Sequence, residues 1–272
     1  MAHRRIEIPA AVIKAVSTRW PDLAPAWQET APCELARICQ QYKGHPVRTF
    51  KARYGFVVEV ETTRGYLVAR STPDPMGLMQ AEVSRSLSEL GIGPTIFEVI
   101  QTPTSVWTVT SRIFPGDSQR GRNVPLERLA PIFRKMHDQD MTLDRLPTLA
   151  NWLQSRLSGE DHSDLSPGTS PASPDDRRRA AALLTDLEAS TSNRLCHGDT
   201  SSNNILRGPG RQLFLIDPRG VSGDVCYDMA VAAWKTAREE RPSTRAAMLA
   251  RLVGTDPDRV QAWLQVAQIA RV

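Results

Sequence analysis

Residues 195–228 read LCHGDTSSNNILRGPGRQLFLIDPRGVSGDVCYD and carry the strongest pattern of the chain. A His-Gly-Asp run ends at Asp199, Asn204 follows it closely, and a later apolar run leads directly to Asp217. The glycines and proline of segment 208–210 predict a tight turn, so the apolar runs on its two sides are expected to pair as short strands. Such a hairpin would bring Asn204 and Asp217 to the same rim.

These three polar side chains suit phosphoryl transfer from a nucleotide. That reaction needs a carboxylate to orient or deprotonate the attacking hydroxyl, and oxygen ligands to hold Mg²⁺ against the phosphates. Asp199 fits the first role, and Asn204 and Asp217 fit the second, because carboxamide and carboxylate oxygens are hard ligands. Taken alone, each Asp is better explained as a helix cap or a turn former. All three together at this spacing favour the catalytic interpretation.

The run HGDxxxxN followed by IDPRGxxGDxxYD resembles the antibiotic phosphotransferases of the protein-kinase-like fold. Among them it is most similar to the streptomycin 6-kinase and hydroxyurea kinase group. The resemblance implies an α+β, two-lobed fold with a small antiparallel β-sheet N-lobe and a mainly helical C-lobe. Residues 1–113 would form the N-lobe, including a helical N-terminal extension, and residues 114–272 the C-lobe with the catalytic and metal-binding loops.

The same resemblance implies cofactors and supporting residues. ATP or GTP would be the phosphate donor, with Mg²⁺ as the metal. His197 and Asp228 would support the catalytic loop rather than carry protons. Asp224 is well placed to cap the helix expected after it, and a carboxylate at Asp228 is favourable in the first turn of that helix.

The N-terminal part changes its pattern near residue 47. Residues 10–44 have helical spacing, which Pro21 and Pro32 are expected to divide into separate helices. Residues 47–70 alternate with a period of two, predict strands and end in the sequence LVAR.

Arg70 stands at the end of that strand, where a kinase-like lobe normally carries a Lys that touches the nucleotide phosphates. Arg keeps the charge, but its planar head is not interchangeable with a compact ammonium. Glu82, on the helix expected over 76–90, is the expected partner. The alternatives of a surface Arg and a solvated helix Glu stay open.

Two further stretches have expected roles. Residues 111–116 resemble the hinge between the lobes, where Ser111 and Ile113 would bind the adenine through main-chain groups. Residues 158–176 are rich in Ser, Pro, Asp and Gly and predict a mobile surface loop. That loop would either cover a substrate or be an insertion without a role.

Composition excludes several classes of protein. The chain has 272 residues, of which 40% are hydrophobic and 24% charged, as in an ordinary globular protein. A net charge of +4 is too small and scattered to indicate nucleic-acid binding. No apolar run approaches the roughly 18 residues of a membrane helix, and no apolar stretch follows the basic start, so a cytoplasmic location is expected. The cysteines form no CxxC pair and are expected to be packed, reduced thiols.

The substrate stays open at this level. A streptomycin-like aminoglycoside is the first choice from the resemblance, and its positive charge would need acidic residues, for which Asp224 and Glu239 are candidates. Glu239 is better explained as part of a solvated helix end. The alternatives are a kinase of another small metabolite or antibiotic, such as hydroxyurea, and a catalytically silent protein that binds a nucleotide or a partner. The presence of Asp199, Asn204 and Asp217 favours an active enzyme.

Overall fold

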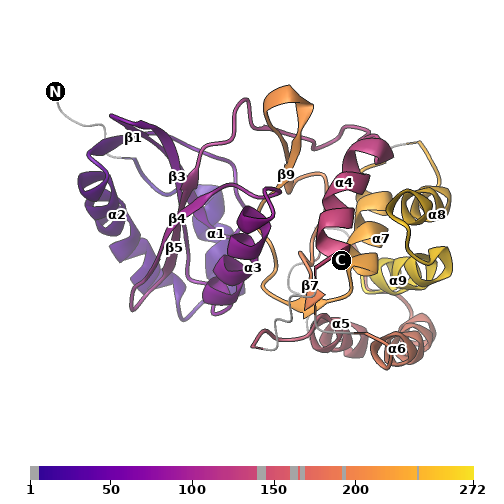
Figure 1. Cartoon of the computed structure of the whole chain (residues 1–272). Helices are drawn as coiled ribbons and strands as arrows, with labels where there is room; N and C mark the ends of the chain where they lie inside the picture. The colour runs from indigo at the N-terminus through magenta and orange to yellow at the C-terminus, as the bar shows by residue number, and fades with distance from the viewer. Residues whose placement is uncertain (1–5, 140–144, 160–164, 166–168, 192–193, 238) are drawn as a thin grey trace. The chain divides into compact units, whose positions relative to one another are not determined.

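A computed structural model describes residues 6–139, 145–159, 165, 169–191, 194–237 and 239–272. The contacts within it divide the chain into two compact units. The first unit comprises Met1–Ser88 and Pro94–Arg112, and the second comprises Glu89–Gly93 and Ile113–Val272. The first contains an antiparallel sheet and the second is mainly helical (Figure 1), which confirms the predicted α+β class.

The sheet of the first unit has five strands in the described residues, in the order β1-β2-β3-β5-β4. All neighbouring strands are antiparallel. Val58, Val60 and Ala69 are buried on this sheet, as expected of β-branched and small residues on a half-buried pleated surface. The strands are β1 (Gly44–Thr49), β2 (Phe56–Thr62), β3 (Gly65–Thr72), β4 (Ile96–Gln101) and β5 (Val106–Ser111).

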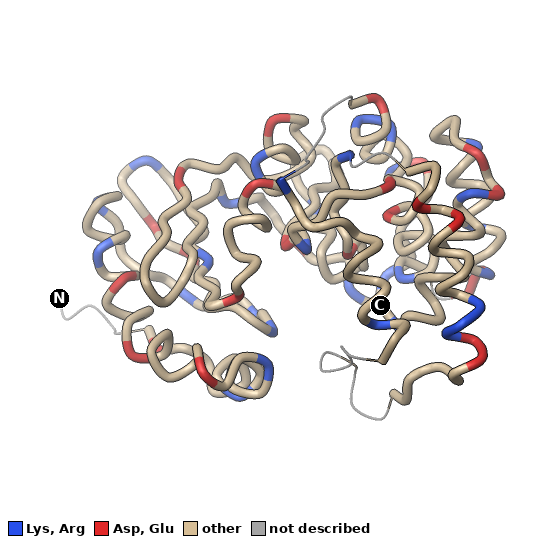
Figure 2. Tube along the Cα trace, turned by 90° about the horizontal axis from the view of Figure 1, so that it is seen from below, with Lys and Arg blue, Asp and Glu red and all other residues tan. Residues whose placement is uncertain are grey.

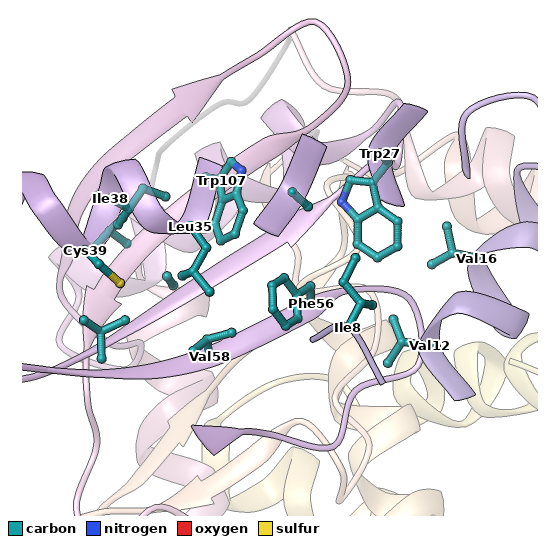
Figure 3. Packing of buried hydrophobic residues seen from close by; sticks show 14 of the residues in the cluster. Ile8, Val12, Val16, Trp27, Leu35, Ile38, Cys39, Phe56, Val58 and Trp107 are labelled. Carbon is teal, nitrogen blue, oxygen red and sulfur yellow. The ribbon is translucent and has the colours of Figure 1, made fainter. Parts of the chain in front are cut away.

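Helices α1 (Ala10–Arg19) and α2 (Ala24–Gln41) build the core of this unit with the sheet. Figure 3 shows Trp27 and Trp107 packed with Phe56 in that core. Each indole N–H has a partner: Trp27 Nε1 donates to Ser71 Oγ at 3.0 Å, and Trp107 Nε1 to Glu34 Oε2 at 2.8 Å. These bonds satisfy the only polar atom of each indole, so the rings bury their large apolar surface without an unmet donor.

The second unit is built around helix α7 (Val225–Lys235), whose residues from Val225 to Ala233 are all buried. Helix α7 packs against α4 (Leu126–His137), α8 (Pro242–Val253) and α9 (Pro257–Ile269), as Figure 1 shows. Helices α5 (Leu149–Ser158) and α6 (Pro174–Glu188) pack against each other. Of the expected loop 158–176, residues 160–164 and 166–168 lie outside the described residues, and α6 begins within it.

Short strands complete the second unit. β6 (Asp117–Ser118), β8 (Ile205–Arg207) and β9 (Leu213–Leu215) form a sheet in the order β6-β8-β9. β7 (Arg194–Leu195) pairs with β10 (Ser222–Gly223). Of these, β7, β8, β9 and β10 lie directly before or after the polar residues of the 195–228 motif, so they set the positions of those residues.

Two buried arginines in the second unit donate hydrogen bonds to backbone carbonyls, including carbonyls at the ends of α7 and α9. Arg245 is 1% exposed, and it donates from Nε to Ala233 O at 3.3 Å and from Nη2 to Val124 O at 2.8 Å. Arg156 is equally buried and donates from Nε to Ala270 O at 2.9 Å, just after α9. The last carbonyls of a helix have no intrahelical partner, so these guanidinium groups satisfy backbone acceptors that would otherwise be buried unmet.

The distribution of charged residues and the lengths of the apolar helices in the structure agree with the expectations from the sequence. Figure 2 shows acidic and basic residues interspersed along the trace rather than gathered by sign. Among the helices that the structure describes, none combines the length and the apolar character needed to cross a bilayer.

Candidate active site

The predicted hairpin forms, and it brings Asn204 next to the strand end that leads to Asp217. β8 and β9 are antiparallel, with Ile205 opposite Leu215. Beyond this pair, the backbone N–H of Ile216 donates to Asn204 O at 3.0 Å. The rim predicted from the two apolar runs is therefore present.

Asn204 and Asp199 are in direct contact. Asn204 Nδ2 donates to Asp199 Oδ2 and to Asp199 O, each at 3.0 Å. Because the amide nitrogen is committed to Asp199, the amide oxygen of Asn204 is the atom that remains for another ligand. Asp199 and Asn204 are both half-buried, so the pair is fixed by packing yet open to solvent.

Asp217 completes the polar group at the end of β9. It is exposed and has φ 58°, a left-handed conformation that Asp and Asn tolerate better than most residues. Within the described residues no group of three or more His, Cys, Asp or Glu side chains gathers in a metal-binding arrangement. The donors present are thus one carboxamide and a few carboxylates. That set suits Mg²⁺, which binds one or two carboxylates and keeps waters or phosphate oxygens as its other ligands.

His197 joins the loop to the strand end. Its Nε2 lies 2.9 Å from Ile216 O, and the backbone N–H of Asp199 donates to its Nδ1 at 3.2 Å. A backbone N–H can only donate, so Nδ1 accepts and Nε2 carries the proton that is donated to Ile216 O. Burial lowers the pKa of His197 below its ordinary value, which agrees with a neutral ring. Both ring nitrogens are occupied by the backbone on either side of the site.

Asp228, on α7, accepts hydrogen bonds from the backbone of the same loop. It is fully buried in the first turn of α7, where Oδ2 accepts from His197 N at 2.7 Å and Oδ1 from Gly198 N at 2.9 Å. Its backbone oxygen accepts from Thr200 Oγ1 at 2.6 Å. Burial raises the pKa of the Asp228 carboxyl to about 7, against the two backbone donors that favour the ionised form. One side chain thus fixes the backbone immediately before Asp199.

Gly198 is required at its position for two reasons. Its φ is +80°, which favours glycine, and a Cβ there would lie 2.8 Å from Arg219 Cβ. Arg219 in turn donates its backbone N–H to His197 O at 2.8 Å. The two segments of the motif therefore approach each other more closely than any other residue would allow.

The sequence did not single out Arg219 or Trp152, although both lie at this site. The Arg219 guanidinium stacks on the Trp152 ring, with Cζ 3.9 Å from the ring centroid. Arg219 belongs to the DPRG run, two residues after Asp217. Trp152 comes from α5, and nothing in its local sequence indicates the contact.

The two residues proposed for a cationic substrate lie in different environments. Asp224 caps α7 by accepting from Cys226 N at 2.8 Å, and its Oδ2 accepts from Arg259 Nε at 2.5 Å and Trp263 Nε1 at 2.8 Å. Its carboxylate is therefore already engaged inside the second unit. Glu239 is exposed.

The predicted nucleotide residues divide between the units. In the first unit, Arg70 Nη2 donates to Gln80 Oε1 at 3.1 Å, whereas the expected partner Glu82 is exposed on α3 (Gly77–Glu89). Ser111 uses its backbone N–H for Thr95 O at 2.8 Å and its hydroxyl for Thr95 N at 3.0 Å. Ile113 is half-buried in the second unit.

The antiparallel sheet, the helical second unit and the polar loop between β7 and β10 define a protein-kinase-like phosphotransferase. A sequence model of the phosphotransferase enzyme family, APH, matches residues 46–263, and the chain belongs to this family. The predicted family is thereby confirmed, and membership in a phosphotransferase enzyme family agrees with the predicted enzyme class.

Pairwise similarity to individual proteins is lower than the match to the family model suggests. The chain is 31% identical over 86 residues to a hydroxyurea phosphotransferase of Kitasatospora aureofaciens, and the match covers 32% of this chain and 25% of that relative. The solved choline kinase LicA of Streptococcus pneumoniae superposes with a TM-score of 0.64 at 13% identity, over 89% of this chain and 91% of that chain. A spectinomycin phosphotransferase, solved in complex with ADP and spectinomycin, superposes with a TM-score of 0.59 at 11% identity, over 88% of this chain and 85% of that chain. At these identities the solved structures support the fold.

Proposed function

We propose that this protein transfers the γ-phosphoryl group of ATP or GTP to a hydroxyl of a small molecule, with Asp199 as the catalytic base. The contact of Asn204 Nδ2 with Asp199 Oδ2 at 3.0 Å carries this proposal. It joins the expected base to an expected metal ligand in one preformed group, which a protein without catalysis would not need. That contact favours an active enzyme over a silent nucleotide-binding protein.

Asn204 and Asp217 would hold Mg²⁺ through the amide oxygen and the exposed carboxylate. Bound there, the metal would neutralise charge that develops on the nucleotide phosphates. The left-handed backbone at Asp217 and the Ile216–Asn204 hydrogen bond support this assignment, because both depend on the hairpin that the motif builds. The protein's own contribution is thus to fix a few oxygen ligands at one rim.

Asp199 would accept the proton of the substrate hydroxyl at Oδ1, since Oδ2 is held by Asn204. His197 would keep the backbone of Asp199 in place and would not exchange protons, because its Nδ1 accepts from Asp199 N and its Nε2 donates to Ile216 O. Asp228 would support the same backbone one residue earlier.

For the acceptor we propose a compact hydroxyl-bearing molecule such as hydroxyurea. The relative from Kitasatospora aureofaciens supports this choice, although the match covers a quarter of its length. A streptomycin-like aminoglycoside is the second candidate, supported by the similarity of the HGDxxxxN and IDPRG runs to that group. It would need carboxylates, and Asp224 is engaged with Arg259 and Trp263. This observation favours the compact acceptor.

Transfer to each acceptor tests the proposal. Purified wild type, Asp199→Asn and the matched surface variant Asp256→Asn would be incubated with ATP or GTP, Mg²⁺ and either hydroxyurea or streptomycin, and the phosphorylated product quantified by mass spectrometry. We expect transfer by wild type and Asp256→Asn, and a loss in Asp199→Asn of about 10²- to 10⁴-fold in kcat with nucleotide binding retained. Unchanged turnover by Asp199→Asn would refute the assignment of the base. Transfer to streptomycin alone would refute the choice of acceptor.

A further inference from the structure

The first unit contains a chain of hydrogen bonds that starts at Arg70. Arg70 Nη2 donates to Gln80 Oε1 at 3.1 Å, and Gln80 Nε2 donates to Asp74 Oδ2 at 2.8 Å. The other oxygen of Asp74 accepts from Met76 N at 2.9 Å, which fixes the carboxylate at the start of α3. A neutral amide therefore lies next to the arginine, and the negative charge of Asp74 stands on the far side of that amide.

The groups at the two ends of this series of hydrogen bonds, Arg70 and Asp74, determine the direction in which each bond is donated. A guanidinium can only donate, and an ionised carboxylate can only accept. Gln80 therefore has its oxygen toward Arg70 and its nitrogen toward Asp74, and the reverse orientation would place donor against donor. Asp74 thus controls which atom Gln80 presents to Arg70.

Arg70 also lies beside a glycine turn. A Cβ at Gly55, between β1 and β2, would lie 3.7 Å from Arg70 Nε and 3.9 Å from its Cγ. The turn therefore lies beside the arginine side chain, at a spacing where even an added Cβ would make only ordinary van der Waals contact with it. A planar guanidinium at a phosphate site has to be held in one orientation to form paired hydrogen bonds.

We propose that Gln80 and Asp74 are positioning residues that orient the Arg70 guanidinium for the nucleotide phosphates. This inference rests on the proposed function, because it takes Arg70 to be a nucleotide ligand. The hydrogen bonds from Arg70 to Gln80 and from Gln80 to Asp74, here called the relay, link the arginine to a carboxylate through an amide. The orientation of that amide depends on Asp74. A substitution that reverses the donor and acceptor atoms of the relay should therefore weaken nucleotide binding, and a second substitution that completes the relay again should restore it.

Asp74 is a suitable position for this exchange. It is half-buried and lines an open groove of about 210 Å³ together with Leu23 and Leu78, so Asn fits without repacking a core. The Asp74→Asn variant would keep the bond from Met76 N through its amide oxygen and present its amino group to Gln80. Gln80 would then turn its oxygen toward that amino group and its nitrogen toward Arg70, where a donor faces a cation.

The decisive comparison is Asp74→Asn against the double variant Asp74→Asn/Gln80→Glu. In the double variant, the new amide nitrogen donates to one oxygen of the introduced carboxylate and the other oxygen accepts from Arg70, so the relay is complete again. We expect Asp74→Asn to raise the KM and Kd of the nucleotide about tenfold with kcat little changed, and the double variant to return within about twofold of wild type. Asp22→Asn, the other carboxylate lining the groove, is the matched control and should bind as wild type does.

Direct titration with ATP and Mg²⁺ by calorimetry separates the outcomes without requiring an acceptor. If wild type binds and Asp74→Asn binds equally well, the relay is refuted while the proposed function stands. Equal weakening in the single and double variants also refutes it, because it would indicate a local structural loss. If wild type binds neither ATP nor GTP, the relay and the proposed function fail together.

Discussion

Replacing Asp228 with Asn tests whether one buried carboxylate holds the catalytic loop. Asp228 accepts from His197 N at 2.7 Å and Gly198 N at 2.9 Å with different oxygens. Asn has one acceptor oxygen, so its amino group would face one of these backbone N–H groups and leave a buried donor unmet. Above pH 7, where the buried carboxyl is ionised, a lost hydrogen bond to a charged group and an unmet donor together cost about 3 kcal/mol. For a protein of this size that corresponds to a fall of about 6–12 °C in melting temperature.

Thermal and urea melts of Asp228→Asn would be compared with Asp256→Asn. Asp256 is the exposed N-cap of α9, where Asn caps equally well, and its variant should change stability by less than about 0.5 kcal/mol. A cost below about 1 kcal/mol for Asp228→Asn would refute the reasoning about the two backbone donors.

The difference in stability between wild type and Asp228→Asn should also depend on pH, and the sign of that dependence is defined. Burial raises the pKa of Asp228 to about 7, from about 4 in the unfolded chain. The folded state therefore binds this proton more tightly, and the contribution of Asp228 to the free energy of unfolding falls as pH rises from about 4 to about 7. Since Asn does not titrate, the stability difference between wild type and Asp228→Asn should shrink as the pH is raised through this range. A difference that grows instead would contradict the raised pKa.

Further variants in the second unit have equally definite outcomes. Gly198→Ala should cost about 2 kcal/mol or more in urea unfolding, because φ +80° strains Ala and its Cβ would lie 2.8 Å from Arg219 Cβ. Arg245→Met should cost about 3 kcal/mol by leaving buried carbonyls such as that of Ala233 unmet, while the exposed Arg251→Met on α8 should be neutral. Trp152→Leu should remove about 1 kcal/mol by taking the ring from the Arg219 guanidinium, and a loss below about 0.3 kcal/mol would contradict that stacking.

Much of the fold was predictable because local patterns and tertiary packing agree. The period of two over residues 47–70 correctly predicted β2 and β3, whereas β1 begins earlier, at Gly44. The turn at 208–210 produced the hairpin β8–β9. The predicted break at Pro32 was wrong, since Pro32 lies inside α2. Burial of Trp27 and Leu35 on the same helix outweighs the one hydrogen bond that proline removes.

The candidate site was predictable where its residues lie in one continuous motif. The contact of Asp199 with Asn204 and the support from Asp228 follow from a loop, a hairpin and a helix start that the sequence spells out. Contacts that depend on side-chain packing between distant segments were not predictable. The stacking of Arg219 on Trp152 belongs to this class, and so does the hydrogen bond from Arg70 to Gln80.

The most direct test of the phosphotransferase site is the melting temperature of wild type and Asp217→Asn with ATP, in the presence of Mg²⁺ or of EDTA. Asn tolerates the left-handed backbone at this position, so the variant removes the charge and keeps the conformation. A ligand at about 100 times its Kd stabilises the folded state by about 2.7 kcal/mol. We predict a Mg²⁺-dependent rise in wild type that Asp217→Asn loses. An equal rise in both proteins, or no Mg²⁺-dependent rise in wild type, would contradict the assignment of Asp217 to the metal.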